Sequence, residues 1–565
     1  MRLKSRYNLL EPFFLILLII LAGCVAKNQD LRDVSSDQSN GVSVNPVSDD
    51  LKNQILNSRG PIIVVFGENS VRLSNQVSKF YELQNYQPVW TSNSKILPQA
   101  NTFINIIREA ENEGLEPSDY HLKDINIYLN EIQKGKDSVD PHMLAQFDLL
   151  LTDAFILYVS HLINGRIEPQ GVDLTWLKNH SNVDFGKIMN LSLGSNQFQN
   201  VISNYENPLY IRLRTALIKY KIVQANGGWL LIPSGPKIEK GQRGERIKLL
   251  RERLMISGDL NAQSTDVSNV YDEEVEGAVR KFQRRHGLAE DGIVGPETLT
   301  ELNVPVEKRI EQIKINMERY RWLPQNIGPR YIQVNIPSFH LDVIQNGKTV
   351  LAMPVVVGKP YWNTPLFSAN MTYIILNPYW NIPRSIALEE TLPKIQSDPE
   401  YLSKRNIRVL QGWTDGSTEI DPSTIDWFQV NNNNLKYRFR QNPGPSNPLG
   451  RIKFMLPNEY NVYLHDTSQK NLFKKQRRDF SHGCIRVENP IGLAEYVLSV
   501  EPGWTKERIE SEIRKGKSQS IILPEPVPVY LVYFTAWVDD NGDIQFRRDV
   551  YGRDEALYES LRRTS

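Results

Sequence analysis

The stretch from Tyr463 to Arg486 reads YLHDTSQKNLFKKQRRDFSHGCIR and contains Cys484, one of two cysteines in the chain. The other, Cys24, follows an apolar N-terminal run, so we expect Cys484 to be a free thiol. A cysteine attacks an acyl carbon as the thiolate, and with an ordinary pKa of about 8.5 it is mostly protonated at neutral pH. A base is therefore needed. His465 is the best candidate because it lies outside the tight turn that holds the thiol.

The residues next to Cys484 also suit acyl transfer. We expect His482, two residues before the thiol, to position the loop or to assist the base. Gly483 lets the backbone turn so that nearby amides face a developing oxyanion, where each donor contributes about 3 kcal/mol. Arg486 offers a two-pronged donor for a substrate carboxylate, and Ser481 is a further candidate contact. A lone cysteine or histidine is often a core residue, but this grouping favours a catalytic loop.

Short β-branched segments surround this stretch and predict a mostly β domain over 306–565, entered by a charged helix over Val306–Tyr320. The clearest strands are Tyr331–Ile336, Leu341–Ile344, Met353–Gly358 and Tyr373–Asn377. Val529–Val538 and Ile544–Phe546 flank an Asn-Gly turn and predict a hairpin.

The strand pattern lapses at about 384–442 into a polar insertion that contains Gly412–Gly416 and Asn431–Asn434. Such an excursion is either a lid or a decorative, partly disordered segment. Its position just before the catalytic stretch favours a lid.

Two helical regions precede this domain. Apolar residues at helical spacing, as in Leu144–Tyr158, predict a mainly helical region over 51–235. A second region, 236–305, shows three short amphipathic helices around the glycine-rich turn Asp291–Pro296.

The N-terminus has the pattern of a secretory signal over 1–23. Basic residues precede the apolar run Phe13–Leu21, which is shorter than the roughly 20 residues that span a bilayer. Leu21-Ala22-Gly23-Cys24 resembles a bacterial lipobox, which implies a lipid on Cys24. An ordinary signal peptide with an incidental cysteine is the alternative. Val25 favours the outer membrane, and the polar residues over 24–50 predict a flexible tether that leaves the body facing the periplasm.

Composition excludes some functions. With 66 basic and 65 acidic residues, the formal net charge is +1, so nucleic acid is not an expected partner. No HExxH or paired CxxC motif occurs, so we expect no metal and no cofactor.

His465 followed by fifteen residues and then Ser481-His482-Gly483-Cys484-Ile485-Arg486 resembles the signature of the YkuD-type L,D-transpeptidases. The strings NPYWNIPRSIA, NPLGRIKF and YLHDT resemble the large YcbB-like branch, and KFQRRHGLAEDGIVGPETLTEL resembles a peptidoglycan-binding module. The chain is thus identified as a multidomain α+β protein. It has a helical scaffold domain, a three-helix peptidoglycan-binding module and a mostly β catalytic domain with a lid-like insertion. The lipobox and Arg486, where many relatives have asparagine, depart from the pattern.

The resemblance implies that Cys484 attacks the third residue of a peptidoglycan tetrapeptide stem and releases D-alanine, with His465 as base. A second stem then gives a 3-to-3 cross-link, and carbapenems form the same adduct. Tyr463 and Trp380 would face the substrate or belong to the core. The same acyl-enzyme could instead trim D-alanine or attach an envelope protein. The chain could also be a non-catalytic, lipid-anchored tether, and the module over 236–305 could bind nothing.

Overall fold

The computed structural model describes residues 45–58, 60–66, 69–92, 95–135, 139–167, 183–204, 207–261, 268–324, 327–412 and 417–563. The predicted signal peptide, Cys24 and most of the predicted tether lie outside the described residues, as does 413–416 of the insertion.

The N-terminal domain is helical, as predicted, with two small hairpins. Its helices are α1 (Pro46–Asn57), α2 (Asn75–Leu83), α3 (Pro98–Arg108), α4 (Leu122–Lys134), α5 (Pro141–Asn164), α6 (Phe185–Ser195), α7 (Phe198–Ser203) and α8 (Pro208–Ala225). The hairpins pair β1 (Ile63–Phe66) with β2 (Asn69–Arg72) and β3 (Thr91–Ser92) with β4 (Lys95–Ile96). The first helix begins at Pro46, inside the segment predicted to be a tether.

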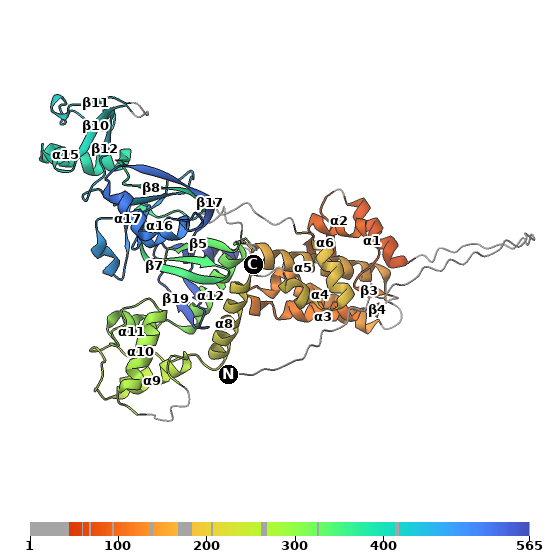
Figure 1. The fold of residues 1–565 in the computed structure, drawn as a ribbon. Coiled ribbons are helices and arrows are strands. Elements are labelled where there is room, and N and C mark those ends of the chain that lie inside the picture. Colours follow the sequence, from red (N-terminus) through yellow and green to blue (C-terminus); the bar gives the residue numbers. More distant parts are fainter. Residues whose placement is uncertain are drawn as a thin grey trace, which may run out of the picture. The chain divides into compact units, whose positions relative to one another are not determined.

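Helix α5 is the centre of this domain (Figure 1). It is long and apolar enough to cross a membrane. However, 83% of its most apolar 18-residue stretch is buried inside the fold, as in a core helix. Because its apolar residues go all round the helix, neighbouring elements pack against every side of it.

A fully buried carboxylate, Asp148 of α5, joins this core to the loop before β3. It accepts hydrogen bonds from the Tyr81 hydroxyl at 2.6 Å, the Val89 amide at 2.8 Å, the Trp90 amide at 3.0 Å and the Thr91 hydroxyl at 2.9 Å. Burial nevertheless raises the pKa of Asp148 to about 6, although these four donors oppose the shift.

The second domain has the three predicted helices, α9 (Glu245–Ile256), α10 (Glu273–Arg285) and α11 (Pro296–Leu302). Their apolar faces form a separate core that includes Leu250, Val279 and Phe282. The Tyr271 hydroxyl closes the glycine-rich turn by donating to the Gly292 carbonyl at 2.6 Å.

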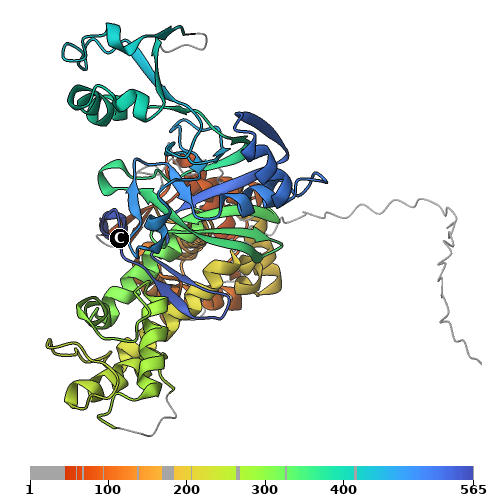
Figure 2. The same ribbon diagram turned by 60° about the vertical axis from the view of Figure 1, so that its left-hand side comes forward.

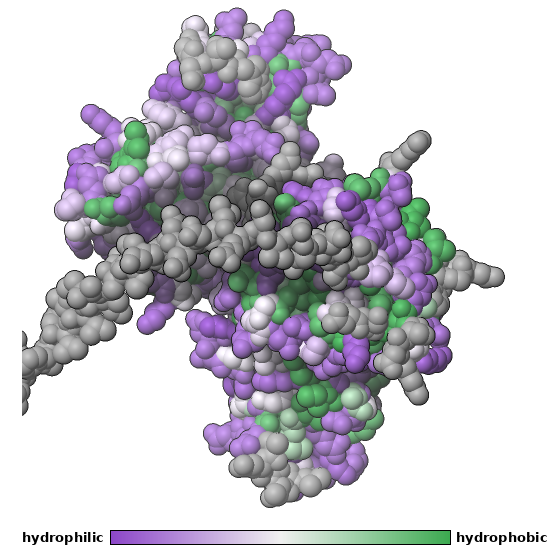
Figure 3. Space-filling model, turned by 90° about the vertical axis from the view of Figure 1, so that its right-hand side faces the viewer, coloured by the Kyte–Doolittle hydropathy of each residue, from purple (hydrophilic) through white to green (hydrophobic). Residues whose placement is uncertain are grey.

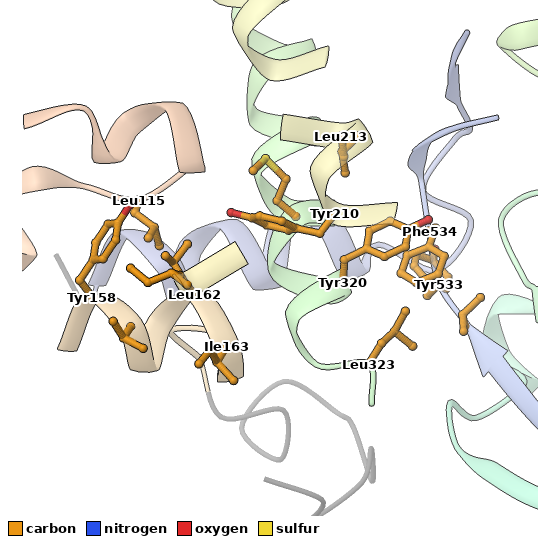
Figure 4. Packing of buried hydrophobic residues seen from close by; sticks show 14 of the residues in the cluster. Leu115, Tyr158, Leu162, Ile163, Tyr210, Leu213, Tyr320, Leu323, Tyr533 and Phe534 are labelled. Atoms are coloured by element: carbon orange, nitrogen blue, oxygen red, sulfur yellow. The ribbon is translucent and has the colours of Figure 1, made fainter. Parts of the chain in front are cut away.

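The predicted charged connector is helix α12 (Val306–Arg321), and several of its charges are internal. The side chains pair at short range: Arg309 with Glu301 at 2.6 Å, Arg319 with Asp554 at 2.6 Å and Arg321 with Glu318 at 2.9 Å. Tyr320 stacks on Phe534 with ring centroids 4.2 Å apart, and Tyr210 of α8 lies in the same group of aromatic side chains (Figure 4). The connector is therefore part of the core.

The third domain is built on a nine-stranded sheet in the order β15-β7-β16-β14-β13-β8-β17-β5-β6, and β6 also pairs with β7. The strands are β5 (Arg330–Asn335), β6 (His340–Gln345), β7 (Lys348–Gly358), β8 (Ser368–Leu376), β13 (Ile452–Met455), β14 (Leu464–His465), β15 (Asp479–Ser481), β16 (Ile485–Val487) and β17 (Gln519–Val532). The extra pairing closes the sheet into a ring of strands with β15 attached to β7. Helices α16 (Pro490–Leu498) and α17 (Lys506–Arg514) lie in the chain between β16 and β17, and α18 (Arg553–Arg563) comes after the last strand.

The hairpin predicted around Asn541-Gly542 is confirmed, and its first segment, Val529–Val538, is divided between two strands. Strand β17 ends at Val532, and β18 (Ala536–Val538) pairs only with β19 (Ile544–Phe546) among the described strands. The chain leaves the large sheet between them because the backbone of Phe534 and Thr535 bonds to side chains: the Phe534 amide donates to Asn335 and the Thr535 amide to Asn316.

The insertion has strands and a core of its own (Figure 2). Its sheet has the order β11-β10-β12-β9, formed by β9 (Trp380–Asn381), β10 (Ile407–Gln411), β11 (Glu419–Ile420) and β12 (Tyr437–Gln441). Its helices are α13 (Arg384–Ile386), a π-helical turn Ala387–Thr391, α14 (Leu392–Ser397) and α15 (Tyr401–Lys404). The sequence pattern predicted no strands in this insertion, and that prediction is wrong. The strands are short, and many of their outward-facing residues are polar.

Apolar side chains on the surface are scattered. On the face shown in Figure 3, the described residues are mainly hydrophilic, and apolar side chains form small groups between polar ones.

Candidate active site

The register of two parallel strands gathers the predicted catalytic residues on one face of the sheet. Strands β14 and β16 pair Leu464 with Ile485 and His465 with Arg486. Leu464 and Ile485 are fully buried on the core side. Because side chains alternate along a strand, Tyr463 and His465 on one strand, and Cys484 and Arg486 on the other, project from the opposite face.

Hydrogen bonds hold the turn before Cys484. Gly483 has a φ of +108°, which favours glycine, and its amide donates to the Ser481 hydroxyl at 3.1 Å. That hydroxyl donates to the Cys484 carbonyl at 2.6 Å, and the Thr364 hydroxyl donates to the Gly483 carbonyl at 2.8 Å. Ser481 is 2% exposed and its hydroxyl shapes the loop, and its substrate contact stays a prediction.

The tautomer of His465 follows from its surroundings. Its Nδ1 lies 2.5 Å from the Asp466 carbonyl, which can only accept, so Nδ1 carries the hydrogen and Nε2 is the free acceptor. Burial and the positive charges of Arg486 and Lys453 together lower the pKa of His465 to about 3, although the Asp466 carbonyl opposes this shift. The imidazole is therefore neutral at pH 7 and able to take a proton.

Four groups favour the thiolate form of Cys484 against the effect of burial. Burial raises the pKa of this thiol, whereas the Tyr463 amide and hydroxyl, Lys453 and Arg486 act to lower it. The Lys453 Nζ lies 3.7 Å from the centroid of the Tyr463 ring, and Lys453 is paired with His465 across β13 and β14. This arrangement favours the thiolate by direct hydrogen bonds and by positive charge.

Lys453 is a functional candidate that sequence reasoning missed. The signal available was a lysine between two apolar residues in the predicted segment Ile452–Phe454. Only the pairing of β13 with β14 shows that it faces the thiol.

A hydrogen bond fixes one nitrogen of the Arg486 guanidinium. Its Nη1 donates to the Gln469 side chain at 2.6 Å, and burial lowers the pKa of its guanidinium. Carboxylate binding by Arg486 stays a prediction.

His482 contacts the insertion. Its Nε2 lies 2.8 Å from the Glu390 Oε1, and its ring lies against Trp362 with centroids 4.2 Å apart. Glu390 belongs to the π-helical turn Ala387–Thr391, and neither Glu390 nor Trp362 was a candidate from sequence. No local pattern links residues so distant in the chain.

Trp380 lies apart from this group. It belongs to β9 and packs against the core of the insertion, in agreement with the alternative that it is a core residue.

Among the described residues, no group of three or more His, Cys, Asp or Glu side chains is arranged to hold a metal ion.

Comparisons with known proteins identify the domains of the chain. Residues 329–517 match the family model of the L,D-transpeptidase catalytic domain, residues 75–217 that of a scaffold domain and residues 243–302 that of a peptidoglycan binding domain. A Haemophilus influenzae protein assigned by name as an L,D-transpeptidase is 35% identical over 247 residues, which is 44% of this chain and 49% of that protein. The chain thus spans about half the length of this curated relative.

Solved structures also match at low identity. An L,D-transpeptidase from Xylanimonas cellulosilytica is 15% identical and covers 53% of this chain and 99% of its own, with a TM-score of 0.16. An L,D-transpeptidase solved in complex with imipenem is 12% identical and covers 36% of this chain and 59% of its own, with a TM-score of 0.17. On the family matches, the chain contains an L,D-transpeptidase catalytic domain, a peptidoglycan binding domain and a helical scaffold domain.

Proposed function

We propose that this protein is an L,D-transpeptidase that forms 3-to-3 peptidoglycan cross-links through a thioester on Cys484. The observation that carries the proposal is the shared sheet face of Cys484, His465, Tyr463 and Arg486, within the region that matches the catalytic domain. A free thiol beside a neutral imidazole is the arrangement that acyl transfer through sulfur requires.

In the first step, His465 Nε2 takes the thiol proton while the sulfur attacks the carbonyl of the third residue of the donor stem. The Tyr463 hydroxyl and Lys453 stabilise the developing thiolate. His465 then returns the proton to the leaving amine of D-alanine as the C–N bond breaks. The product is the thioester on Cys484.

The Cys484 amide is the candidate oxyanion donor. The Gly483 amide, also a candidate from the sequence, already donates to Ser481. Within the described part of the chain, the Cys484 amide donates to no backbone carbonyl, so it is available to a substrate oxygen.

Mass spectrometry of disaccharide-tetrapeptide muropeptides incubated with the full-length protein tests the proposal. We expect a dimer that has lost one D-alanine, and no such product from Cys484→Ala. Tripeptide alone would instead indicate a carboxypeptidase. Unaltered muropeptides with a folded protein would favour attachment of an envelope protein or a non-catalytic tether.

A second test uses the nucleophile directly. Imipenem is a carbapenem, the class of inhibitor expected to acylate Cys484, and an L,D-transpeptidase has been solved in complex with it. Imipenem should add its mass to the wild-type protein and leave Cys484→Ala unmodified. An equal mass increase in both proteins would place the reactive group elsewhere.

We also propose an envelope location, with a lipid on Cys24 and the body facing the periplasm, and with the domain at 243–302 holding peptidoglycan. Incorporation of a labelled fatty acid into the wild type, and its loss in Cys24→Ala, would support the anchor. Equal labelling of both proteins would contradict it.

A further inference from the structure

We propose that Glu390, from the insertion, positions His482 as the base that deprotonates the acceptor amine at the start of the second half-reaction. His465 is the base of the first half-reaction and carries the last proton of the second to the sulfur. This inference rests on the proposed function, because it concerns the attack on the thioester.

The geometry around His482 leaves one nitrogen free. Its Nε2 lies at ion-pair distance, 2.8 Å, from the Glu390 carboxylate without an aligned hydrogen bond, and the negative charge there favours a hydrogen on Nε2 and leaves Nδ1 as the acceptor. The Trp362 ring, 4.2 Å away, covers the imidazole and limits its rotation. A carboxylate beside an imidazole holds its tautomer and stabilises the imidazolium that forms when it takes a proton.

The two histidines differ in access. His465 is 5% exposed, and its Nδ1 is held by the Asp466 carbonyl. The side chain of His482 is 27% exposed and that of Glu390 is 38% exposed. A second substrate therefore reaches the Glu390–His482 pair more easily than it reaches His465.

The acceptor requires such a base. A side-chain amine is an ammonium ion at neutral pH, with an ordinary pKa of about 10.4, and cannot attack a carbonyl until it loses a proton. The negative charge of Glu390 also attracts an ammonium ion. Glu390 is also close enough to Arg486 for its charge to raise the pKa of that guanidinium, against burial.

The acceptor nitrogen loses two protons in this half-reaction. The ammonium gives one proton to His482 Nδ1, and its lone pair attacks the thioester carbonyl to form a C–N bond. The tetrahedral intermediate loses a second proton to His465 and collapses with cleavage of the C–S bond. His465 gives that proton to the Cys484 thiolate, and the imidazolium of His482 releases its proton to solvent.

The charged groups that face His482 are Glu390, Lys359 and Arg486. Burial and the two cations lower the pKa of His482, and Glu390 opposes that shift. Removing the carboxylate charge should lower this pKa further and weaken the base.

The test compares Glu390→Gln with the wild type and with Glu389→Gln, its exposed neighbour in the same turn. The full-length proteins are acylated with tetrapeptide muropeptide, and the first equivalent of D-alanine, dimer and tripeptide are followed separately from pH 6 to 9. D-alanine release here means this first equivalent, which acylation alone produces. We expect Glu390→Gln to release it within twofold of the wild-type rate. Its dimer formation at pH 7 should fall about tenfold, with the loss shrinking as pH rises and the free amine increases. Glu389→Gln should behave as the wild type, and Glu390→Asp should recover part of the dimer.

A double-mutant cycle separates positioning from a general effect on folding. In a His482→Gln background, Glu390→Gln should cause no further loss of dimer. Equal falls in D-alanine release and dimer, or an unchanged dimer yield, would overturn the proposal while leaving the wild-type transpeptidase intact. Absence of D-alanine release from the wild type would instead refute the proposed function itself.

Discussion

Tyr463→Phe should raise the pKa of the Cys484 thiol. The Tyr463 hydroxyl is one of the groups that oppose the effect of burial on that pKa. The phenylalanine keeps the ring, so the contact with Lys453 at 3.7 Å from the ring centroid stays in place. The substitution therefore removes a single donor from the thiolate.

The magnitude follows from the strength of a hydrogen bond to a charged acceptor, about 1.5 kcal/mol. Because one pKa unit corresponds to about 1.4 kcal/mol, the pKa of the thiol should rise by about one unit. At neutral pH the thiolate fraction, and with it the rate of reactions limited by that fraction, should fall about tenfold.

Alkylation by iodoacetamide, followed by intact mass from pH 6 to 10.5, measures this pKa directly because Cys484 is the only cysteine in the described chain. The Cys24→Ala background removes the second cysteine of the full sequence. Tyr496→Phe is the matched control, since its hydroxyl contacts Gln345 at 3.3 Å and not the thiol. A midpoint for Tyr463→Phe at or below the control value would refute the role assigned to this hydroxyl.

Three further changes have defined outcomes. Lys453→Met should raise the pKa of Cys484 by about one unit in the same alkylation profile, because it removes a positive charge near the thiolate, and Lys453→Arg should not. Gly450→Ala should lower the free energy of unfolding in urea by at least about 2 kcal/mol, because Gly450 has a φ of +61° and a Cβ there would overlap the Asp466 side chain. The carboxyl of Asp148 has a folded pKa of about 6, so its stabilising effect is complete below its ordinary pKa and is lost as pH rises through 6. Asp148→Asn should abolish this loss of about 3 kcal/mol, measured by urea unfolding from pH 4 to 7.

The fold classes of the three domains could be predicted from the sequence because their signals are local. Helical spacing in Leu144–Tyr158 predicted α5, and the glycine-rich turn Asp291–Pro296 predicted the three-helix module. Boundaries that depend on long-range bonding were predicted less well. The chain leaves the large sheet after Val532 because of side chains at Asn316 and Asn335, which no window around Val532 contains.

The candidate nucleophile and its base could be chosen from sequence because thiol and imidazole chemistry is a property of the residue types at Cys484 and His465. Their closeness comes from the parallel pairing of β14 with β16.

The remaining members of the site were decided by tertiary structure alone. Lys453 faces the thiol because β13 pairs with β14, and Glu390 reaches His482 because the insertion folds on its own core. Residue type and spacing determine what chemistry a side chain can do. Which side chains share a low-dielectric site depends on strand register and domain packing, which arise from many weak contacts spread over the chain.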